Sequence, residues 1–227
     1  MKQIPLAITP ASAPTFDAFL PGANAAALAH LRALQPGAAP VYVWGPSGAG
    51  KTHLLRALAD AWQREGRQVG WFDPAAPAPW PADEPWDLVV LDDCDRFDAA
   101  RQHAAFALFV HAQSAGIAVA AAGRLPPVDL PLRDDLRTRL GWGHVFAIEP
   151  LPEEPARAVL RREADRRGVV LSDDVLDYLL TRFRRDLKHL MALLDRLDGF
   201  ALAEQRALTV PLLKRMLAED AGETATR

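Results

Sequence analysis

The 227-residue chain contains a single cysteine, Cys94, which excludes an internal disulfide framework and any cysteine-rich zinc site. Its first residues lack an apolar stretch followed by a cleavage site, so we expect no signal peptide. No apolar run approaches the roughly 18–20 residues needed to cross a bilayer. Positive charge is not in surplus either, because 26 basic and 29 acidic side chains give a net charge of −3. These absences predict a soluble, cytoplasmic protein without membrane contact, and they argue against a dedicated nucleic-acid binder.

Half of the residues are apolar, and the length suggests one to two domains with a core of their own. Short apolar runs alternate with amphipathic stretches through the first two thirds of the chain. They predict strands at 41–44, 69–72, 88–91, 117–121 and 144–148, and helices at 51–65, 99–114 and 132–140. This alternation is typical of an α/β fold in which helices cover both faces of a parallel sheet.

After Pro150 the strand-like runs stop, and only helical patterns follow. We expect helices at 154–167, 173–183, 186–197 and 210–217, which would form a small all-α lid domain. The predicted organisation is therefore an N-terminal peptide and linker (1–14), an α/β nucleotide-binding domain (15–150) and a helical lid (151–227). Five prolines between Pro74 and Pro85 predict an irregular surface loop inside the α/β domain.

The strongest motif is a phosphate-binding loop that fits the pattern G-x-x-x-x-G-K-[ST] in full. It consists of Gly45, Pro46, Ser47, Gly48, Ala49, Gly50, Lys51 and Thr52. Glycines let successive backbone amides point at phosphate oxygens, and the start of the following helix favours the same anion. We expect Lys51 to reach the β- and γ-phosphates and the Thr52 hydroxyl to join the shell of a Mg²⁺ ion. The predicted cofactors are ATP or ADP with Mg²⁺.

Two acids, Asp92 and Asp93, directly follow the apolar run at 88–91. An acid at the carboxyl end of a strand beside a phosphate loop is the expected Walker-B arrangement. Asp92 would hold Mg²⁺, directly or through water, and Asp93 would orient or deprotonate the attacking water. The alternative is a turn-forming pair of aspartates with Asp95 nearby.

Four further segments carry a family resemblance: Thr15–Phe19, Gly123–Pro127, Asp135–Leu140 and Asp186–Leu190. With the phosphate loop, they make the chain similar to AAA+ P-loop NTPases of the replication-initiator clade over residues 15–217. The chain most closely resembles the Hda family of DnaA-related regulatory inactivators. DnaA carries a helix-turn-helix DNA-binding domain after its lid, and too few residues follow Leu217 for one. The resemblance therefore implies no strong direct binding to DNA.

The resemblance also implies roles for individual residues. Arg139 matches the arginine finger, a cation that completes the nucleotide site of a neighbouring subunit. Arg137 is the alternative finger, and a plain ion pair of Arg139 with Asp134 or Asp135 is the non-functional alternative. Lys188 stands where relatives carry the sensor-2 arginine and would contact nucleotide. The sensor-1 strand, residues 117–122, has no Asn, Thr or Ser, so we expect hydrolysis by this chain itself to be weak.

The N-terminal stretch at residues 3–8 resembles the peptide by which proteins bind the replicative sliding clamp. Gln3 would satisfy polar groups at the rim of a pocket, while Ile4 and Leu6 would enter an apolar groove. The alternative is an ordinary chain terminus.

Together these features predict a nucleotide-binding AAA+ regulator that binds the sliding clamp and promotes hydrolysis of ATP on DnaA. Such a protein would restrain replication initiation from a position near the replisome and nucleoid. Its partners would be ATP-bound DnaA and the clamp, and self-association stays open. Two rival functions are an autonomous AAA+ ATPase acting as a loader or chaperone, and a truncated initiator paralogue that binds DNA.

Overall fold

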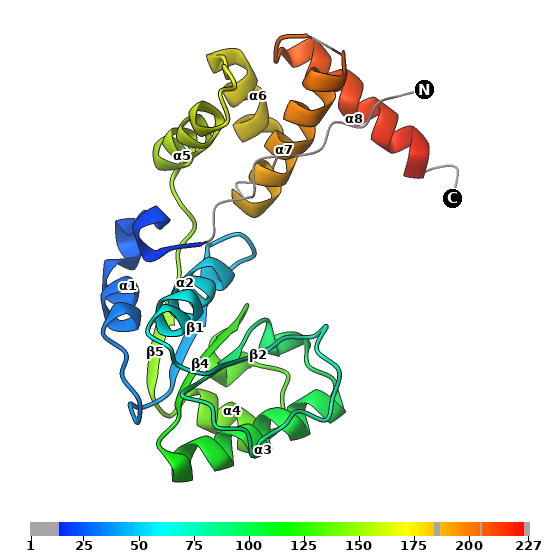
Figure 1. Cartoon of the computed structure of the whole chain (residues 1–227). Helices are drawn as coiled ribbons and strands as arrows, with labels where there is room; N and C mark the ends of the chain where they lie inside the picture. The colour runs from blue at the N-terminus through cyan, green and yellow to red at the C-terminus, as the bar shows by residue number, and fades with distance from the viewer. Residues whose placement is uncertain (1–13, 184–186, 205, 225–227) are drawn as a thin grey trace. The chain divides into compact units, whose positions relative to one another are not determined.

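The computed structural model describes residues 14–183, 187–204 and 206–224. The chain divides into two compact units with a boundary between Pro150 and Leu151 (Figure 1). The first unit contains the strands and their covering helices. In chain order, with η for 3₁₀ helices, its elements are η1 (Phe16–Ala18), η2 (Gly22–Asn24), α1 (Ala25–Arg32), β1 (Val41–Trp44), α2 (Lys51–Arg64), β2 (Val69–Phe72), β3 (Leu88–Leu91), η3 (Cys94–Arg96), α3 (Ala99–Ala115), β4 (Ala118–Gly123), η4 (Pro127–Asp129), α4 (Asp134–Leu140) and β5 (His144–Ala147).

The five strands form one parallel sheet in the order β2-β3-β4-β1-β5. The predicted parallel sheet flanked by helices is thus confirmed. Strand β4 lies between β1 and β3, and its last residue, Gly123, pairs with Trp44 at the end of β1. The segments that follow β1, β3 and β4 therefore meet at one carboxyl edge of the sheet, which is where ligands bind in open α/β sheets.

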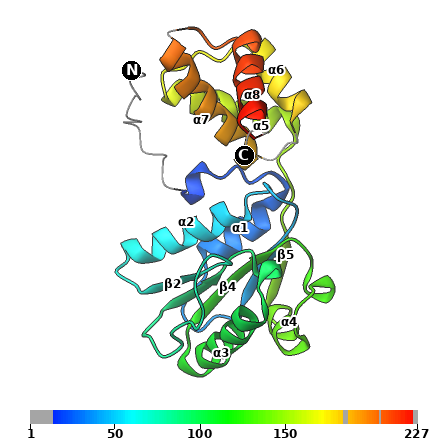
Figure 2. The same cartoon turned by 90° about the vertical axis from the view of Figure 1, so that its right-hand side faces the viewer.

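Alternating strand residues divide the core between the two faces of the sheet. Val41 and Val43 pack with Leu54 and other side chains of α1 and α2, whereas Tyr42 packs with Leu136 and other side chains of α3 and α4. Figure 2 shows α1 and α2 on one side of the sheet and α3 and α4 on the other. The period-2 alternation of a strand thus sets which helices each residue meets.

Two features of this unit were not expected from the sequence. Helix α1 follows an asparagine whose side chain makes no helix cap, so no start signal marks it. The proline-rich loop is irregular, as predicted, but it is not wholly at the surface. Its Trp80 is buried against the rings of Phe72 and Phe97, at centroid distances of 4.8 and 5.2 Å.

The second unit contains four helices within its described part: α5 (Glu153–Arg166), α6 (Asp173–Arg182), α7 (Leu187–Glu204) and α8 (Val210–Thr224). Their core is aliphatic, with Leu160, Leu176, Leu190 and Leu213 fully buried. Helices α7 and α8 run seven residues further than predicted. In α7 the apolar face continues to Ala201 past Gly199, and burial of that face outweighs the weak helix propensity of glycine.

Arginines on α5 are paired with acids across the helical unit. Arg167 lies 2.6 Å from Glu163 and also contacts Asp195 of α7, while Arg161 contacts Asp173 of α6. Within the described segments, no helix is long and apolar enough to span a membrane.

Candidate nucleotide-binding site

The phosphate loop turns sharply between β1 and α2, and its glycines are required by close contacts. Gly45 has a φ of +152°, and a Cβ atom there would lie 2.3 Å from the carbonyl oxygen of Ile148. Gly50 has a φ of +101°, and a Cβ atom would lie 2.7 Å from the ring of Phe19. Pro46, Ser47, Gly48 and Ala49 complete the curl between them. The loop is therefore built tightly against two other segments, with α2 starting at the residue after it.

Lys51 is held inside this loop and is only 5% exposed. Its Nζ atom donates to the carbonyl oxygens of Gly45 and Pro46, at 2.8 and 2.9 Å. Burial lowers the pKa of this lysine, and the nearby charges of Asp93 and Asp92 oppose that shift. The loop thus places a cation at its centre, which suits binding of a phosphate anion.

Asp92 lies at the end of β3 and is also only 5% exposed. Its carboxylate accepts a hydrogen bond from the amide of Asp93 at 3.1 Å and one from the Thr52 side chain. Burial raises the pKa of Asp92, while the hydrogen bond from Thr52 lowers it. A carboxylate beside a hydroxyl is a set of hard oxygen donors of the kind that Mg²⁺ prefers. The residues present therefore fit a Mg²⁺ ion.

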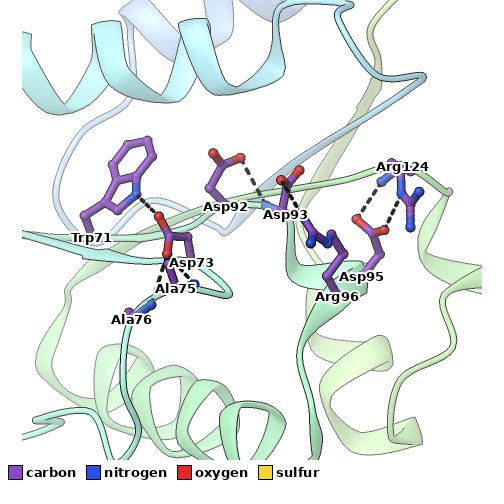
Figure 3. A network of polar contacts seen from close by, with 9 residues as sticks. All are labelled: Trp71, Asp73, Ala75, Ala76, Asp92, Asp93, Asp95, Arg96 and Arg124. Carbon is purple, nitrogen blue, oxygen red and sulfur yellow. Dashed lines mark hydrogen bonds and ion pairs between the residues drawn. The ribbon is translucent and has the colours of Figure 1, made fainter. Parts of the chain in front are cut away.

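Asp93 adopts the left-handed backbone conformation, with φ of +49°, which is uncommon for a residue other than glycine. Its carboxylate lies 3.9 Å from the guanidinium of Arg96 (Figure 3). Such backbone strain is concentrated at functional sites. The ion pair with Arg96 nevertheless competes with the water-orienting role that the sequence suggests for Asp93.

An ion pair between Asp95 and Arg124 lies at the same edge, and the sequence interpretation assigned neither residue a role. The Asp95 side chain is 3% exposed, and it accepts hydrogen bonds from the Arg124 amide at 3.0 Å and from Nε at 2.6 Å (Figure 3). The spacing Asp92-Asp93-x-Asp95 carried a signal, since three acids after one buried strand need a cation nearby. The partner, 29 residues away, could not be identified from that spacing.

Strand β4 offers no polar side chain at this edge, as the sequence suggested. Ala121, Ala122 and Gly123 end the strand. A Cβ atom on Gly123 would lie 2.3 Å from the hydroxyl of Tyr42, which donates to the carbonyl of Leu125 at 2.7 Å. The space beside the end of β4 is thus taken by a tyrosine from β1.

The N-terminal segment at 15–24 packs onto the loop and the first turns of α2. The ring of Phe19 lies against Gly50 and 5.8 Å from the ring of His53, whose Nε2 lies 2.9 Å from the Thr15 carbonyl oxygen. Buried Asn24 donates to the carbonyl of Glu149 at 2.9 Å and accepts from its amide at 2.8 Å. An apolar wall therefore adjoins the phosphate loop.

Helix α4 carries three arginines that differ in their partners. Arg137 pairs with Asp134 and Arg133 pairs with Asp135, each at 2.6 Å. Arg139 instead donates to the side-chain oxygen of Gln113 at 3.0 Å and lies 5.0 Å from the ring centroid of Phe106. Both acids proposed as alternative partners of Arg139 are thus taken by other arginines.

Arg139 lines an open groove of about 670 Å³ on this face of the α/β unit. The groove residues are Phe106, Gln113, Asp134, Asp135, Thr138, Arg139 and Trp142. Trp142 is 63% exposed, which is unusual for so large an apolar ring. A cation beside an exposed aromatic ring is typical of surfaces that bind a partner.

The remaining predicted site residues lie in parts with less to describe. Lys188 lies in the first turn of α7, and its side chain is outside the described part. Gln3, Ile4 and Leu6 also lie outside the described residues.

A parallel sheet with this loop, the acids after β3 and a separate helical unit define a P-loop protein of the AAA+ class. A family model of the bacterial DnaA ATPase domain matches residues 11–70, and a model of the Hda lid domain matches residues 153–217. The chain belongs to the DnaA-related AAA+ proteins and carries a lid domain of the Hda family.

Solved structures share this fold at low sequence identity. Domain III of DnaA from Thermotoga maritima has a TM-score of 0.76 and 20% identity, over 93% of this chain and 98% of that chain. AMPPCP-bound DnaA from Aquifex aeolicus has a TM-score of 0.64 and 20% identity, over 85% of this chain and 68% of that chain. The Thermotoga maritima RuvB Holliday junction branch migration motor has a TM-score of 0.61 and 16% identity, over 84% and 64%.

Proposed function

We propose that this protein is a nucleotide-binding regulator of chromosome replication initiation, which promotes hydrolysis of ATP bound to DnaA. The observation that carries the proposal is the presence, in one chain, of a DnaA-type phosphate-loop domain and an Hda-type lid. Conversion of DnaA to its ADP form would make this a negative regulator. A cytoplasmic location, close to the replisome, follows from such a role.

The nucleotide would be ATP or ADP with Mg²⁺, held at the carboxyl edge of the sheet. Lys51 would exchange its two loop carbonyls for phosphate oxygens, and Asp92 with Thr52 would hold the ion. When bound, Mg²⁺ supplies positive charge that neutralises the phosphates. Binding of AMPPCP by DnaA of Aquifex aeolicus supports the choice of an adenine nucleotide.

Hydrolysis by this chain alone should be slow. Strand β4 presents no polar side chain to a terminal phosphate, and Asp93 is already paired with Arg96. Lys188 in α7 is a point charge that cannot bind a phosphate with two parallel hydrogen bonds. These features favour a regulator over an autonomous loader or chaperone.

Arg139 is our candidate for the group that acts on DnaA. Its guanidinium is held by a neutral amide and an aromatic ring, so its positive charge is not neutralised by a carboxylate partner. A guanidinium aimed at a transferring phosphate stabilises the charge that develops there. The exposed ring of Trp142 in the same groove gives the partner an apolar contact beside that cation.

Phosphate release tests this function directly. Release should be measured for this protein alone, for ATP-bound DnaA alone, and for both together with DNA-loaded clamp. We expect fast release only from the complete mixture. Fast release by this protein alone would support the autonomous ATPase, and retention on duplex DNA without clamp would support the initiator paralogue.

The N-terminal peptide is tested with a variant in which Gln3, Ile4 and Leu6 are all alanine. It should lose co-elution with clamp and clamp-dependent stimulation, while nucleotide affinity and thermal stability stay unchanged, because these residues precede the folded unit. Lys2→Ala serves as a matched control. Co-elution of the triple variant with clamp would show that another surface provides the tether.

A further inference from the structure

Arg124 occupies a particular place in the sheet topology. It follows β4 directly, and β4 lies between β1, which leads into the phosphate loop, and β3, which leads into Asp92 and Asp93. The amide of Gly45 donates to the carbonyl of Gly123 at 3.3 Å, so the loop and the residue before Arg124 are in direct contact. Figure 3 shows Asp92, Asp93, Asp95 and Arg124 along this edge of the sheet.

The guanidinium of Arg124 is fixed at one end and available at the other. Asp95 accepts hydrogen bonds from its amide and from Nε, while the described residues offer its two Nη nitrogens no hydrogen-bond partner. The side chain is 58% exposed, whereas that of Asp95 is 3% exposed. Two donors of a planar cation are therefore left to face solvent beside the site.

The charge of Arg124 also acts on the groups of the site. Hydrogen bonding and attraction to Asp95 raise the pKa of Arg124, and the charge of Asp93 adds to this. Burial lowers the pKa of Lys51, and repulsion from Arg124 contributes to that shift. A bound anion between these two cations would relieve their repulsion, and Arg is well suited to phosphate because its donors form a rigid fork.

We propose that Arg124, positioned by Asp95, contacts the terminal phosphate of a bound nucleoside triphosphate and so lets this chain distinguish ATP from ADP. The inference rests on the nucleotide binding proposed above. It supplies a polar group where β4 ends in Ala121, Ala122 and Gly123. Asp95 acts only through Arg124, as a positioning residue.

Affinities for a non-hydrolysable ATP analogue and for ADP, measured by calorimetry with Mg²⁺, test the proposal. Arg124→Ala should weaken binding of the analogue about tenfold and change ADP binding less than twofold, because only the triphosphate loses a charge-assisted contact. Arg64→Ala is the matched control. Arg64 is an exposed arginine, paired with Asp60 at 2.7 Å, in the last turn of α2, whereas the phosphate loop adjoins the first turn.

Arg124→Ala leaves the buried carboxylate of Asp95 without its cation and could prevent folding. The double variant Asp95→Asn, Arg124→Gln removes both charges and keeps a polar pair of similar size, and it should show the same selective loss. Equal weakening of both nucleotides, or no change in either, would overturn the role of Arg124.

A Lys51→Ala arm separates this inference from the function on which it rests. We expect Lys51→Ala to weaken both nucleotides tenfold or more. Unchanged binding in Lys51→Ala would place nucleotide elsewhere and overturn the proposed site and the role of Arg124 together. Loss of both nucleotides in Lys51→Ala, with no selective loss in Arg124→Ala, would overturn the role of Arg124 alone.

Discussion

The cations at the carboxyl edge of the sheet and those on α4 are held in different ways. Lys51 is buried and bonded to two carbonyls of its own loop, and Arg124 is bonded to a buried carboxylate. Arg139 on α4 has a neutral amide and a ring as partners and lines an open groove. The first arrangement suits a ligand bound within this chain, and the second suits a phosphate brought by another molecule.

This difference explains how a chain with a complete phosphate loop can act mainly on a partner. Groups at the sheet edge are preorganised for binding, yet their acids and cations already neutralise one another in part. The α4 arginines are neutralised at two positions of three. Electrostatic stabilisation needs charge that is placed but not already satisfied, and Arg139 meets that condition.

The largest effect should come from removing that charge. Arg139→Ala should reduce stimulation of DnaA-bound ATP hydrolysis by about 10³-fold or more, the range for such arginines. Its own nucleotide affinity, clamp binding and thermal stability should stay as in the wild type, because the side chain is half-buried and makes one neutral hydrogen bond. Phosphate release from the complete mixture measures the loss.

Arg137→Ala is the matched comparison, two residues away on the same helix. Its guanidinium is already paired with Asp134, so we expect stimulation within threefold of the wild type. The reverse result, with loss only in Arg137→Ala, would move the role to Arg137. Stimulation that survives both substitutions would exclude an arginine finger on α4.

The second effect tests how tightly the sheet edge is built. Gly45→Ala would force a Cβ atom against the Ile148 carbonyl, at 2.3 Å, and should lower the free energy of unfolding by about 2–4 kcal/mol. Gly66→Ala is the control, since Gly66 also has positive φ but has no atom within 4 Å of an added Cβ. That control should cost only about 1 kcal/mol. Denaturant unfolding without nucleotide measures both, and equal losses would contradict tight packing around the loop.

Much of this edge was predictable because its signals are local. The run at 41–44 indicated a strand, the glycines after it indicated the loop, and the acids after residue 91 indicated the next strand end. Each signal lies within about eight residues, and parallel strands bring their carboxyl ends to one edge. The predicted strands and α2 therefore agree with the structure to within a few residues.

The parts that the sequence did not indicate depend on contacts between distant residues. Asp95 meets Arg124 across 29 residues, and Tyr42 meets Leu125 across 83. Helix α1 begins without a cap because the amide of Asn24 is used on the backbone of Glu149. Spacing along a chain indicates which face a residue occupies, but not which partner another strand brings to it.

The smallest effect concerns pH and the apolar wall beside the phosphate loop. His53 lies between the first turns of α2 and the segment at 15–19, and burial there lowers its pKa, although the hydrogen bond to the Thr15 carbonyl opposes the shift. The unfolded chain, with a pKa of about 6.5 at this residue, then binds the proton more readily than the folded chain. Stability is fully present above that value and falls as the pH drops through it toward the lower folded pKa.

His53→Gln should therefore reduce the loss of thermal stability between pH 7.5 and pH 5.5, because glutamine does not titrate and its amide can still donate to Thr15. The effect should be smaller than that of Gly45→Ala, since His30 also has a pKa lowered by burial and keeps its share of the pH dependence. His103→Gln, at an exposed position of α3, serves as the control and should retain the wild-type difference. Melting temperatures of the three proteins at both pH values provide the measurement. An undiminished acid loss in His53→Gln would mean that the wall beside the loop opens to solvent in the free protein, and the contrast between a closed sheet edge and an open α4 face would then be weaker than the structure indicates.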